Sequence, residues 1–279
     1  MTIDNALKKG AERLRNLERP LLQSEILLSF VLKKERIFLH QNAKKELDSF
    51  DEATFFRFIK RRENHEPLEY LTELVSFYEN TFYVSYGALI PRPETEILVE
   101  KARALIEQKG IMNVAEIGIG SGAISISLAK LFPKVNFYAS DISPFALFNA
   151  FMNLKKFNLE NLKLFRSNLL DFMKNEKIEM LISNPPYIAN SYILPKEVQK
   201  EPQIALFGGE NGDEILHKII ELAYCKKIPY LLCEMGYNQK KSILDFVEKM
   251  PYEKIEFYKD FAGLDRGFVI EFLGIKDAE

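Results

Sequence analysis

From residue 113 onward, seven short apolar runs alternate with stretches of helical periodicity. Most of these runs are apolar throughout, which argues against strands that have one face in water. Strands covered on both faces belong to a largely parallel sheet with helices on each side, so we expect an α/β fold. The last two runs have no helix between them and predict an antiparallel hairpin through FAGLDR. The seven runs are VAEIGI, VNFYASDI, LKLFRSNL, EMLISNPPY, PYLLCEMG, KIEFYKD and GFVIEFLG.

The N-terminal part of the chain has a different pattern, in which apolar positions recur every three or four residues as in helices. Ser49, followed by Glu52, is typical of a capping box that opens the last long helix. A stretch rich in aromatic and β-branched residues follows and predicts a β-hairpin that turns at Glu79 and Asn80. We therefore predict a helical domain at 1–72, a hairpin linker at 73–92 and the α/β domain at 93–279.

Composition and charge limit the classes of function. The 279 residues include 38 basic and 40 acidic side chains, and this net charge of −2 gives little support to a protein that binds nucleic acid by neutralising phosphates. The chain has no signal-peptide core and no apolar run long enough to cross a bilayer, so we expect a soluble cytoplasmic protein. The three histidines lack the spacing of metal ligands, so no metal is expected. Cys225 and Cys233 are interpreted as small buried side chains.

A glycine-rich loop comes between the first strand of the α/β domain and a helix. Glycines at this place let the backbone turn tightly and approach a ligand, toward which the first amides of the helix point. Asp141 ends the next strand, about 20 residues further on, where a carboxylate can accept hydrogen bonds from both hydroxyls of a ribose. The ligand is therefore expected to contain a nucleoside, as in a nicotinamide dinucleotide or S-adenosylmethionine. The loop consists of Gly118, Ile119, Gly120, Ser121 and Gly122.

The fourth strand leaves the sheet through Asn184, Pro185, Pro186 and Tyr187. In an open α/β sheet, ligands bind beyond the carboxyl ends of the strands, which is where Asn184 falls. The two prolines remove backbone donors and favour extended geometry, so that carbonyl groups remain free to accept. Asn184 adds a side-chain oxygen acceptor, and Tyr187 adds a flat ring against which a planar group could lie.

This acceptor cluster suits a planar amide or aromatic amine that has two N–H bonds to donate. Such a nitrogen is a poor nucleophile because its lone pair is delocalised. Asn184 and the Pro185 carbonyl could hold the two N–H groups and aim the lone pair at an electrophilic methyl group. Proximity and alignment can contribute on the order of 7 kcal/mol or more, and the acceptors stabilise the charge that builds on the nitrogen. A hydride-transferring dehydrogenase would have no use for this cluster.

The chain resembles the HemK/PrmC family of peptide chain release factor glutamine methyltransferases over nearly its whole length. The motifs that carry the resemblance are EPLEYL, LIPRPETEILVE, EIGIGSGAISISLA, SDISPFAL, ISNPPYI, EPQIALFGGENG, EMGYNQ and DFAGLDRGFV. The family implies a Rossmann-like class I methyltransferase domain with a mostly parallel seven-stranded sheet, a small helical domain for substrate recognition and a β-hairpin linker. It also implies S-adenosyl-L-methionine as cofactor, with S-adenosyl-L-homocysteine as product.

The resemblance implies that the substrate is the glutamine of the Gly-Gly-Gln motif in class-1 release factors, methylated on its side-chain nitrogen. We expect the protein to act as a monomer. By position, the loop from Gly118 to Gly122 would hold the methionine and ribose part of the cofactor, and Asp141 the ribose hydroxyls. Asn168 and Leu169 would hold the adenine. Asn184 would contact both cofactor and substrate, and the glutamine pocket would be completed by Pro185, Pro186 and Tyr187.

Four positions depart from the family pattern. Glu116 stands before the glycine loop where aspartate is usual, so the charge near the cofactor is kept on a longer side chain. Asn168 stands where an acidic residue is common, and its amide oxygen could still accept from adenine. Glu73 and Glu79 occupy positions where glycine is expected, which affects the shape of the hairpin.

A non-enzymatic binding module that keeps the cofactor fold without turnover is disfavoured by the intact NPPY motif. Two other readings stay open on the sequence. One is methylation of a glutamine in a ribosomal protein by an enzyme of similar architecture. The other is methylation of a base amino group in DNA or RNA, because such enzymes share the NPPY motif and flip the base out of the duplex.

Overall fold

The computed structural model describes residues 1–173 and 177–273, which form two compact units. One unit comprises Met1–Leu74 together with Pro195–Lys200, and the other comprises Val75–Leu194 and the chain from Glu201 onward. No helix in the described ranges is long and apolar enough to cross a membrane. The domain boundaries at residues 72 and 92 stay a prediction. The sequence did not predict that the short segment 195–200 belongs to the first unit.

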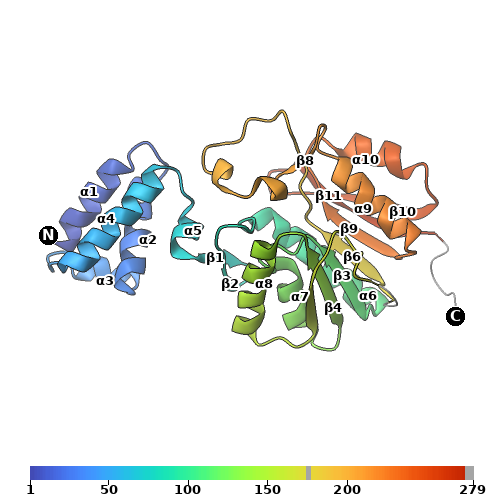
Figure 1. Cartoon of the computed structure of the whole chain (residues 1–279), viewed down its shortest axis with the longest axis horizontal. Coiled ribbons are helices and arrows are strands. Elements are labelled where there is room, and N and C mark those ends of the chain that lie inside the picture. The colour runs from blue at the N-terminus through green and yellow to red at the C-terminus, as the bar shows by residue number, and fades with distance from the viewer. Residues whose placement is uncertain (174–176, 274–279) are drawn as a thin grey trace. The chain divides into compact units, whose positions relative to one another are not determined.

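The first unit is helical, as Figure 1 shows for the blue and cyan part of the chain. Its helices pack around one apolar core. Phe55 and Ile59 of its longest helix are fully buried in this core. That helix is capped by Asp48, which accepts a hydrogen bond from the Asp51 amide at 2.8 Å. The predicted capping box at Ser49 was therefore wrong by one residue, because a carboxylate also makes a strong cap. The helices are α1 (Ile3–Arg13), α2 (Pro20–Leu32), α3 (Arg36–Gln41), α4 (Ser49–Glu63) and α5 (Leu68–Thr72).

A buried arginine explains why the segment 195–200 belongs to this unit. Arg62 donates to the Gln23 side chain at 2.6 Å and to the Glu66 carbonyl at 3.1 Å. Its guanidinium also pairs with Glu197. A buried charge is tolerated when it is paired and fully hydrogen-bonded, and Glu197 supplies the opposite charge here.

The predicted hairpin consists of β1 (Leu74–Phe77) and β2 (Asn80–Tyr83). Its two turn residues are Tyr78 and Glu79, both with positive φ, so the predicted turn at Glu79 and Asn80 was displaced by one residue. Phe77 and Phe82 bury their rings in the core of the second unit.

All seven predicted runs form strands of one sheet in the order β10-β11-β9-β6-β3-β4-β5. Pairing is parallel from β9 to β5, whereas β11 is antiparallel to both of its neighbours and forms the predicted hairpin with β10. The mostly parallel sheet is therefore confirmed. Its strands are β3 (Asn113–Ile117), β4 (Asn136–Asp141), β5 (Leu162–Arg166), β6 (Met180–Ser183), β9 (Tyr230–Glu234), β10 (Tyr252–Lys259) and β11 (Asp265–Phe272).

Helices cover both faces of this sheet (Figure 1). Alternate residues of β3 show the division, because Val114 packs into one apolar core and Ala115 into the other. Cys233 is buried as expected, whereas Cys225 is exposed. One face carries α6 (Glu96–Lys109), α7 (Ala123–Leu131) and α8 (Pro144–Phe157), and the other carries α9 (Glu214–Cys225) and α10 (Lys240–Val247).

Two glycines allow the chain after β6 to pack against a later segment. There β7 (Ile188–Ala189) pairs in parallel with β8 (Phe207–Gly209). A Cβ atom on Gly208 would lie 2.5 Å from the Pro186 carbonyl oxygen, and one on Gly212 would lie 2.5 Å from the Tyr187 carbonyl oxygen. Only glycine permits approaches this close, so these two residues support the backbone of the NPPY motif.

Candidate active site

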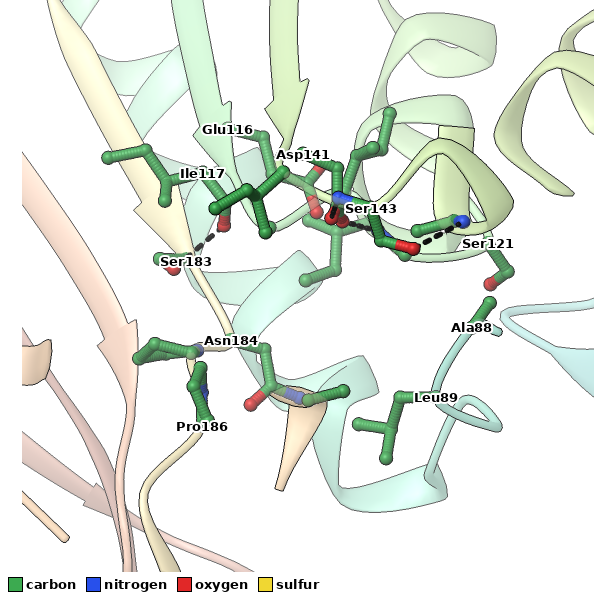
Figure 2. Close-up of a pocket in the computed structure, with 18 of the residues that line it drawn as sticks. Ala88, Leu89, Glu116, Ile117, Ser121, Asp141, Ser143, Ser183, Asn184 and Pro186 are labelled. Atoms are coloured by element: carbon green, nitrogen blue, oxygen red, sulfur yellow. Dashed lines mark hydrogen bonds between the residues drawn. The ribbon is translucent and has the colours of Figure 1, made fainter. Parts of the chain in front are cut away.

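The carboxyl ends of β3, β4 and β6 open onto a cavity of about 350 Å³ in the second unit. This volume falls within the range of about 300–1,000 Å³ that is usual for small-molecule and cofactor sites. Figure 2 shows Glu116, Asp141 and Ser143 grouped at one part of the cavity and Asn184 and Pro186 at another. The predicted site residues that line it are Glu116, Gly118, Ile119, Gly120, Ser121, Asp141, Asn168, Leu169, Asn184, Pro185 and Pro186.

The glycine loop has the backbone that its composition predicts. Gly118 and Gly120 have φ values of 75° and 57°, in the left-handed region that side chains other than glycine adopt at a cost. The amides of Gly118 and Ile119 both donate to the Ser140 carbonyl, which fastens the loop to the end of β4. Gly122 is not among the residues that line the cavity. It precedes α7, and a Cβ atom there would lie 2.6 Å from the Ile126 side chain.

Glu116 is buried beneath this loop with only 1% of its surface exposed. Its carboxylate accepts hydrogen bonds from the Ser125 amide, at 3.0 Å, and from the Ser125 hydroxyl. It thereby caps the N-terminus of α7, where negative charge is stabilised. Burial nevertheless dominates and raises the pKa of Glu116 to about 8. The structure thus gives Glu116 a role in holding the loop, and its predicted contact with cofactor stays a prediction.

The two carboxylate oxygens of Asp141 bind two different segments, the glycine loop and the N-terminus of α8. One oxygen accepts from the Gly120 amide at 3.0 Å, and the other accepts from the Ser143 amide at 2.9 Å. Burial raises the pKa of Asp141, and these backbone hydrogen bonds lower it. Each carboxylate oxygen has more than one acceptor site, so the arrangement leaves room for the hydroxyls of a ribose.

The loop after β5 supplies another wall of the cavity. Leu169 has a φ of 47°, and its carbonyl accepts a hydrogen bond from the Ser140 hydroxyl at 2.6 Å. Asn168 beside it is exposed at the cavity lining. Their position next to Asp141 fits the predicted adenine contact, because an adenine lies next to its own ribose.

The side chain of Asn184 is oriented by a buried hydroxyl. Its amide nitrogen donates to Thr95 Oγ1 at 3.2 Å. Thr95, which also lines the cavity, in turn donates to Glu234 Oε2 at 2.6 Å. With the amide nitrogen committed to Thr95, the amide oxygen of Asn184 is the atom that can serve a ligand as acceptor. Asn184 and the two prolines after it are therefore brought together at the cavity, as predicted.

Tyr187 differs from its predicted placement, because it is not among the residues that line the cavity. Its ring packs against the apolar core that includes Leu231 and Phe268, and its hydroxyl donates to Glu234 Oε1 at 2.9 Å. Burial, together with the charge of Glu234, raises the pKa of this phenol. Tyr187 thus anchors the motif in the protein, and a stacking contact with substrate stays a prediction.

Sequence reasoning missed several residues that shape the site. Thr95 and Glu234 were not singled out, although Glu234 ends the strand next to β6 and could have been found by the rule that identified Asp141. Glu201 was also missed. Its buried carboxylate accepts from the Ile90 amide at 3.0 Å and pairs with Arg92, which lines the cavity. No local pattern announces that pairing, because 109 positions separate its partners.

Comparison with known proteins identifies the family. Residues 5–72 match the family model of the PrmC N-terminal domain, and residues 93–200 match that of the Methyltransferase small domain. The release factor glutamine methyltransferase of Clostridium acetobutylicum is 37% identical over 278 residues, covering 95% of this chain and 97% of that relative. The chain belongs to the release factor glutamine methyltransferase family. The resemblance predicted from its motifs is therefore confirmed.

Other members and one solved structure extend the comparison. The family member of Buchnera aphidicola subsp. Schizaphis graminum is 37% identical over 270 residues, covering 95% of this chain and 98% of that relative. The N-terminal domain of human METTL16, solved in complex with SAH, superposes with a TM-score of 0.55. It covers 88% of this chain and 94% of its own at 17% identity, and so shows that the fold is shared.

Proposed function

We propose that this protein transfers a methyl group from S-adenosyl-L-methionine to the side-chain amide nitrogen of the glutamine in the Gly-Gly-Gln motif of class-1 release factors. Relatives that match nearly the whole chain are named release factor glutamine methyltransferases. The main structural support for this chemistry is the hydrogen bond that the Asn184 amide nitrogen donates to Thr95, because it leaves the amide oxygen of Asn184 as an acceptor at the cavity.

The residues of the cavity fit the cofactor. The glycine loop opens α7, and Asp141 lies beside it with two partly used carboxylate oxygens, as a ribose requires. Asn168 and Leu169 continue the wall on the adenine side. When bound, S-adenosyl-L-methionine supplies an electrophilic methyl group on a positively charged sulfur and leaves as S-adenosyl-L-homocysteine.

The acceptors at the end of β6 would act on the glutamine. Asn184 Oδ1 and the Pro185 carbonyl accept its two amide N–H bonds and so fix the plane of the amide and the direction of its lone pair. Alignment of this kind lowers the barrier because the reacting atoms need no further search. The same acceptor dipoles stabilise positive charge as it develops on the nitrogen, so no base has to remove a proton before attack.

This proposal predicts that Asn184→Ala lowers methyl transfer by about 100-fold or more, because it removes one of the two acceptors that align the amide. Binding of S-adenosylhomocysteine should survive at least in part, since the loop and Asp141 remain. Transfer is measured with isotopically labelled cofactor and an intact release factor, and mass spectrometry locates the methyl group. Asn190→Ala, at an exposed asparagine just beyond β7, is the matched control and should transfer normally. Wild-type transfer by Asn184→Ala, or transfer to a release factor that has alanine in place of the target glutamine, would contradict the proposal.

The proposal also covers partners and location. We place the protein in the cytoplasm, acting on release factors as a monomer and without direct contact with nucleic acid. The net charge of −2 supports the last point. An assay that offers ribosomes and release factors side by side distinguishes the proposed function from methylation of a ribosomal protein, because the proposed enzyme should methylate only the release factor.

A further inference from the structure

Four polar side chains form one connected chain of hydrogen bonds behind the cavity. Glu234 lies at its centre with 1% of its surface exposed. One carboxylate oxygen accepts from the Thr95 hydroxyl at 2.6 Å, and the other accepts from the Tyr187 hydroxyl at 2.9 Å. Thr95, itself 4% exposed, accepts from the Asn184 amide nitrogen at 3.2 Å. Two arms therefore run from one buried carboxylate to the two polar side chains of the NPPY motif.

The chemistry of the carboxylate fixes the direction of the arm through Thr95. The Thr95 hydroxyl donates its single proton to Glu234 Oε2, so that proton points at Glu234 and away from Asn184. The Thr95 oxygen then has only lone pairs left and can bind Asn184 only as an acceptor. Asn184 must in consequence turn its NH₂ group toward Thr95. Its oxygen is thereby kept for the cavity.

We propose that Glu234 is a positioning residue for methyl transfer, which sets the direction of the Thr95 hydroxyl and through it holds the amide oxygen of Asn184 toward the substrate. The proposal rests on the function proposed above and deepens it. It explains why a threonine and a glutamate from distant parts of the chain meet behind an asparagine that has to act as an acceptor. Without the carboxylate, the Thr95 hydroxyl could donate to Asn184 instead, and the amide could turn over.

The second arm keeps the motif itself in place. Tyr187 donates to the other oxygen of Glu234, and the Tyr187 carbonyl accepts from the Gln239 side chain at 2.9 Å. The same carbonyl faces Gly212 closely, as described above. Glu234 therefore stabilises both the orientation of the Asn184 amide and the backbone that carries Pro185.

The surroundings of Glu234 shift the pKa of its carboxyl group in opposite directions, and the net effect is to raise it. Burial raises the pKa of the carboxyl group, and Glu94 adds to this. The hydrogen bonds from Thr95 and Tyr187 and the charge of Arg266 lower it. Arg266 is held by Asp260, to which it donates at 3.1 and 2.8 Å.

Three variants test the arm through Thr95. Thr95→Val is isosteric but has no hydroxyl, and Glu234→Met removes the acceptor from a side chain of similar length. Thr95→Ser keeps the hydroxyl and serves as the conservative rescue. We expect kcat for the release factor to fall by about 10- to 100-fold in the first two variants and to stay within about 3-fold of wild type in Thr95→Ser. The dissociation constant of S-adenosylhomocysteine should change by no more than about 3-fold in all three, because the glycine loop, Asp141 and the wall at Asn168 and Leu169 are untouched.

A second measurement follows the orientation without any turnover. The side-chain NH₂ signals of Asn184, assigned by their loss in Asn184→Asp, are followed by NMR in protein with labelled asparagine. In wild type and in Thr95→Ser the NH₂ proton that the buried hydroxyl accepts should exchange slowly with solvent. In Thr95→Val and Glu234→Met its exchange should be at least about 10-fold faster.

The two measurements separate failure of this inference from failure of the proposed function. If Thr95→Val has the kcat of wild type, or the hydrogen exchange of its Asn184 NH₂ group is as slow as in wild type, the proposed role of Glu234 and Thr95 in orienting Asn184 is overturned. If Glu234→Met does not fold, Thr95→Val against Thr95→Ser still decides the matter. If the wild-type protein fails to methylate release factors, the proposed function is wrong. The hydrogen-exchange rates of the Asn184 NH₂ group still decide whether Thr95 and Glu234 orient Asn184.

Discussion

Three carboxyl groups at the carboxyl edge of the sheet accept hydrogen bonds from the protein, and of these Glu116 and Glu234 are buried and Asp141 is partly buried. Glu116 caps α7, Asp141 accepts from the amides of Gly120 and Ser143, and Glu234 accepts from two hydroxyls. Burial raises the pKa of all three. Asp141 and Glu234 bind residues that line the cavity, and Glu116 holds the first turn of the helix that follows the glycine loop, so all three help to set the shape of the site.

Glu116 should make the stability of the protein depend on pH. Its pKa is about 8 in the folded protein, against a usual value of 4.5. The folded state therefore holds a proton that the unfolded state releases, and this contribution to the free energy of unfolding is present below about pH 4.5 and is lost as the pH rises to about 8. A single such group contributes a slope of up to about 1.4 kcal/mol per pH unit.

Glu116→Gln should remove this contribution, because the amide does not titrate. Urea unfolding at pH 5.5 and 7.5 should show wild type losing on the order of 2 kcal/mol more than Glu116→Gln between the two pH values. Glu160→Gln, at an exposed site, serves as control and should behave as wild type. Equal pH dependence of wild type and Glu116→Gln would show that Glu116 does not hold the extra proton.

The sequence predicted those site residues that sit at recognisable points of a strand or loop. The glycine loop, Asp141 and Asn184 all follow apolar runs, and all of them except Gly122 line the cavity. Thr95 and Glu234 could not be paired in advance, because their contact joins positions 139 apart and depends on which strands become neighbours. Tyr187 was predicted to lie at the site, but its ring packs into the apolar core and its hydroxyl donates to Glu234. That contact with a distant residue could not be predicted from the sequence.

Three residues in or next to the hairpin have a left-handed backbone conformation, with positive φ. Tyr78 and Glu79 form its turn with φ values of 46° and 58°, and Glu73 just before it has a φ of 57°. Turns in which both central residues have positive φ favour glycine at the second position. The absence of glycine at 73 and 79, noted as a departure from the family, thus falls on backbone that suits glycine.

Glu79→Gly should therefore raise the free energy of unfolding by about 0.5–1 kcal/mol, the gain from relieving the left-handed backbone less the greater freedom of glycine in the unfolded chain. Glu79→Ala is the control, because alanine keeps a Cβ atom and hence the strain. Chemical denaturation of both variants gives the comparison. A glycine variant no more stable than the alanine variant would show that the turn stores no such strain.

Element types were predictable here and element ends were less so. The seven strands followed from continuous apolar runs, which a sheet covered on both faces requires. The start of α4 and the turn of the hairpin were each displaced by one residue, since Asp48 competes with Ser49 as a cap and the turn type decides which residues bend. The short strands β7 and β8 form only by pairing with each other around Gly208 and Gly212, so no period in either segment indicates them.

At the scale of the whole molecule, the apolar cores divide between the two units. One core lies within the helical unit, and the other two flank the sheet. The cavity is lined only by residues of the second unit. Ligand binding should therefore stabilise the second unit, while the helical unit keeps its own stability.

Calorimetry should accordingly show two transitions, of which S-adenosylhomocysteine raises only that of the larger unit. At about 100 times its dissociation constant the ligand adds about 2.7 kcal/mol to the unit that binds it. Asp141→Ala should reduce this shift. A single transition, or an equal shift of both, would mean that the units unfold together.

The proposed reaction requires that Asn184 and the Pro185 carbonyl present a glutamine amide nitrogen to the methyl group of the cofactor. The most direct test is a crystal structure of the protein with S-adenosylhomocysteine and a peptide that contains Gly-Gly-Gln. We predict that the glutamine nitrogen lies within hydrogen-bonding distance of Asn184 Oδ1 and of the Pro185 carbonyl oxygen and faces the sulfur of the cofactor. A peptide bound elsewhere, or Asn184 and Pro185 turned away from the sulfur, would rule out the proposed reaction.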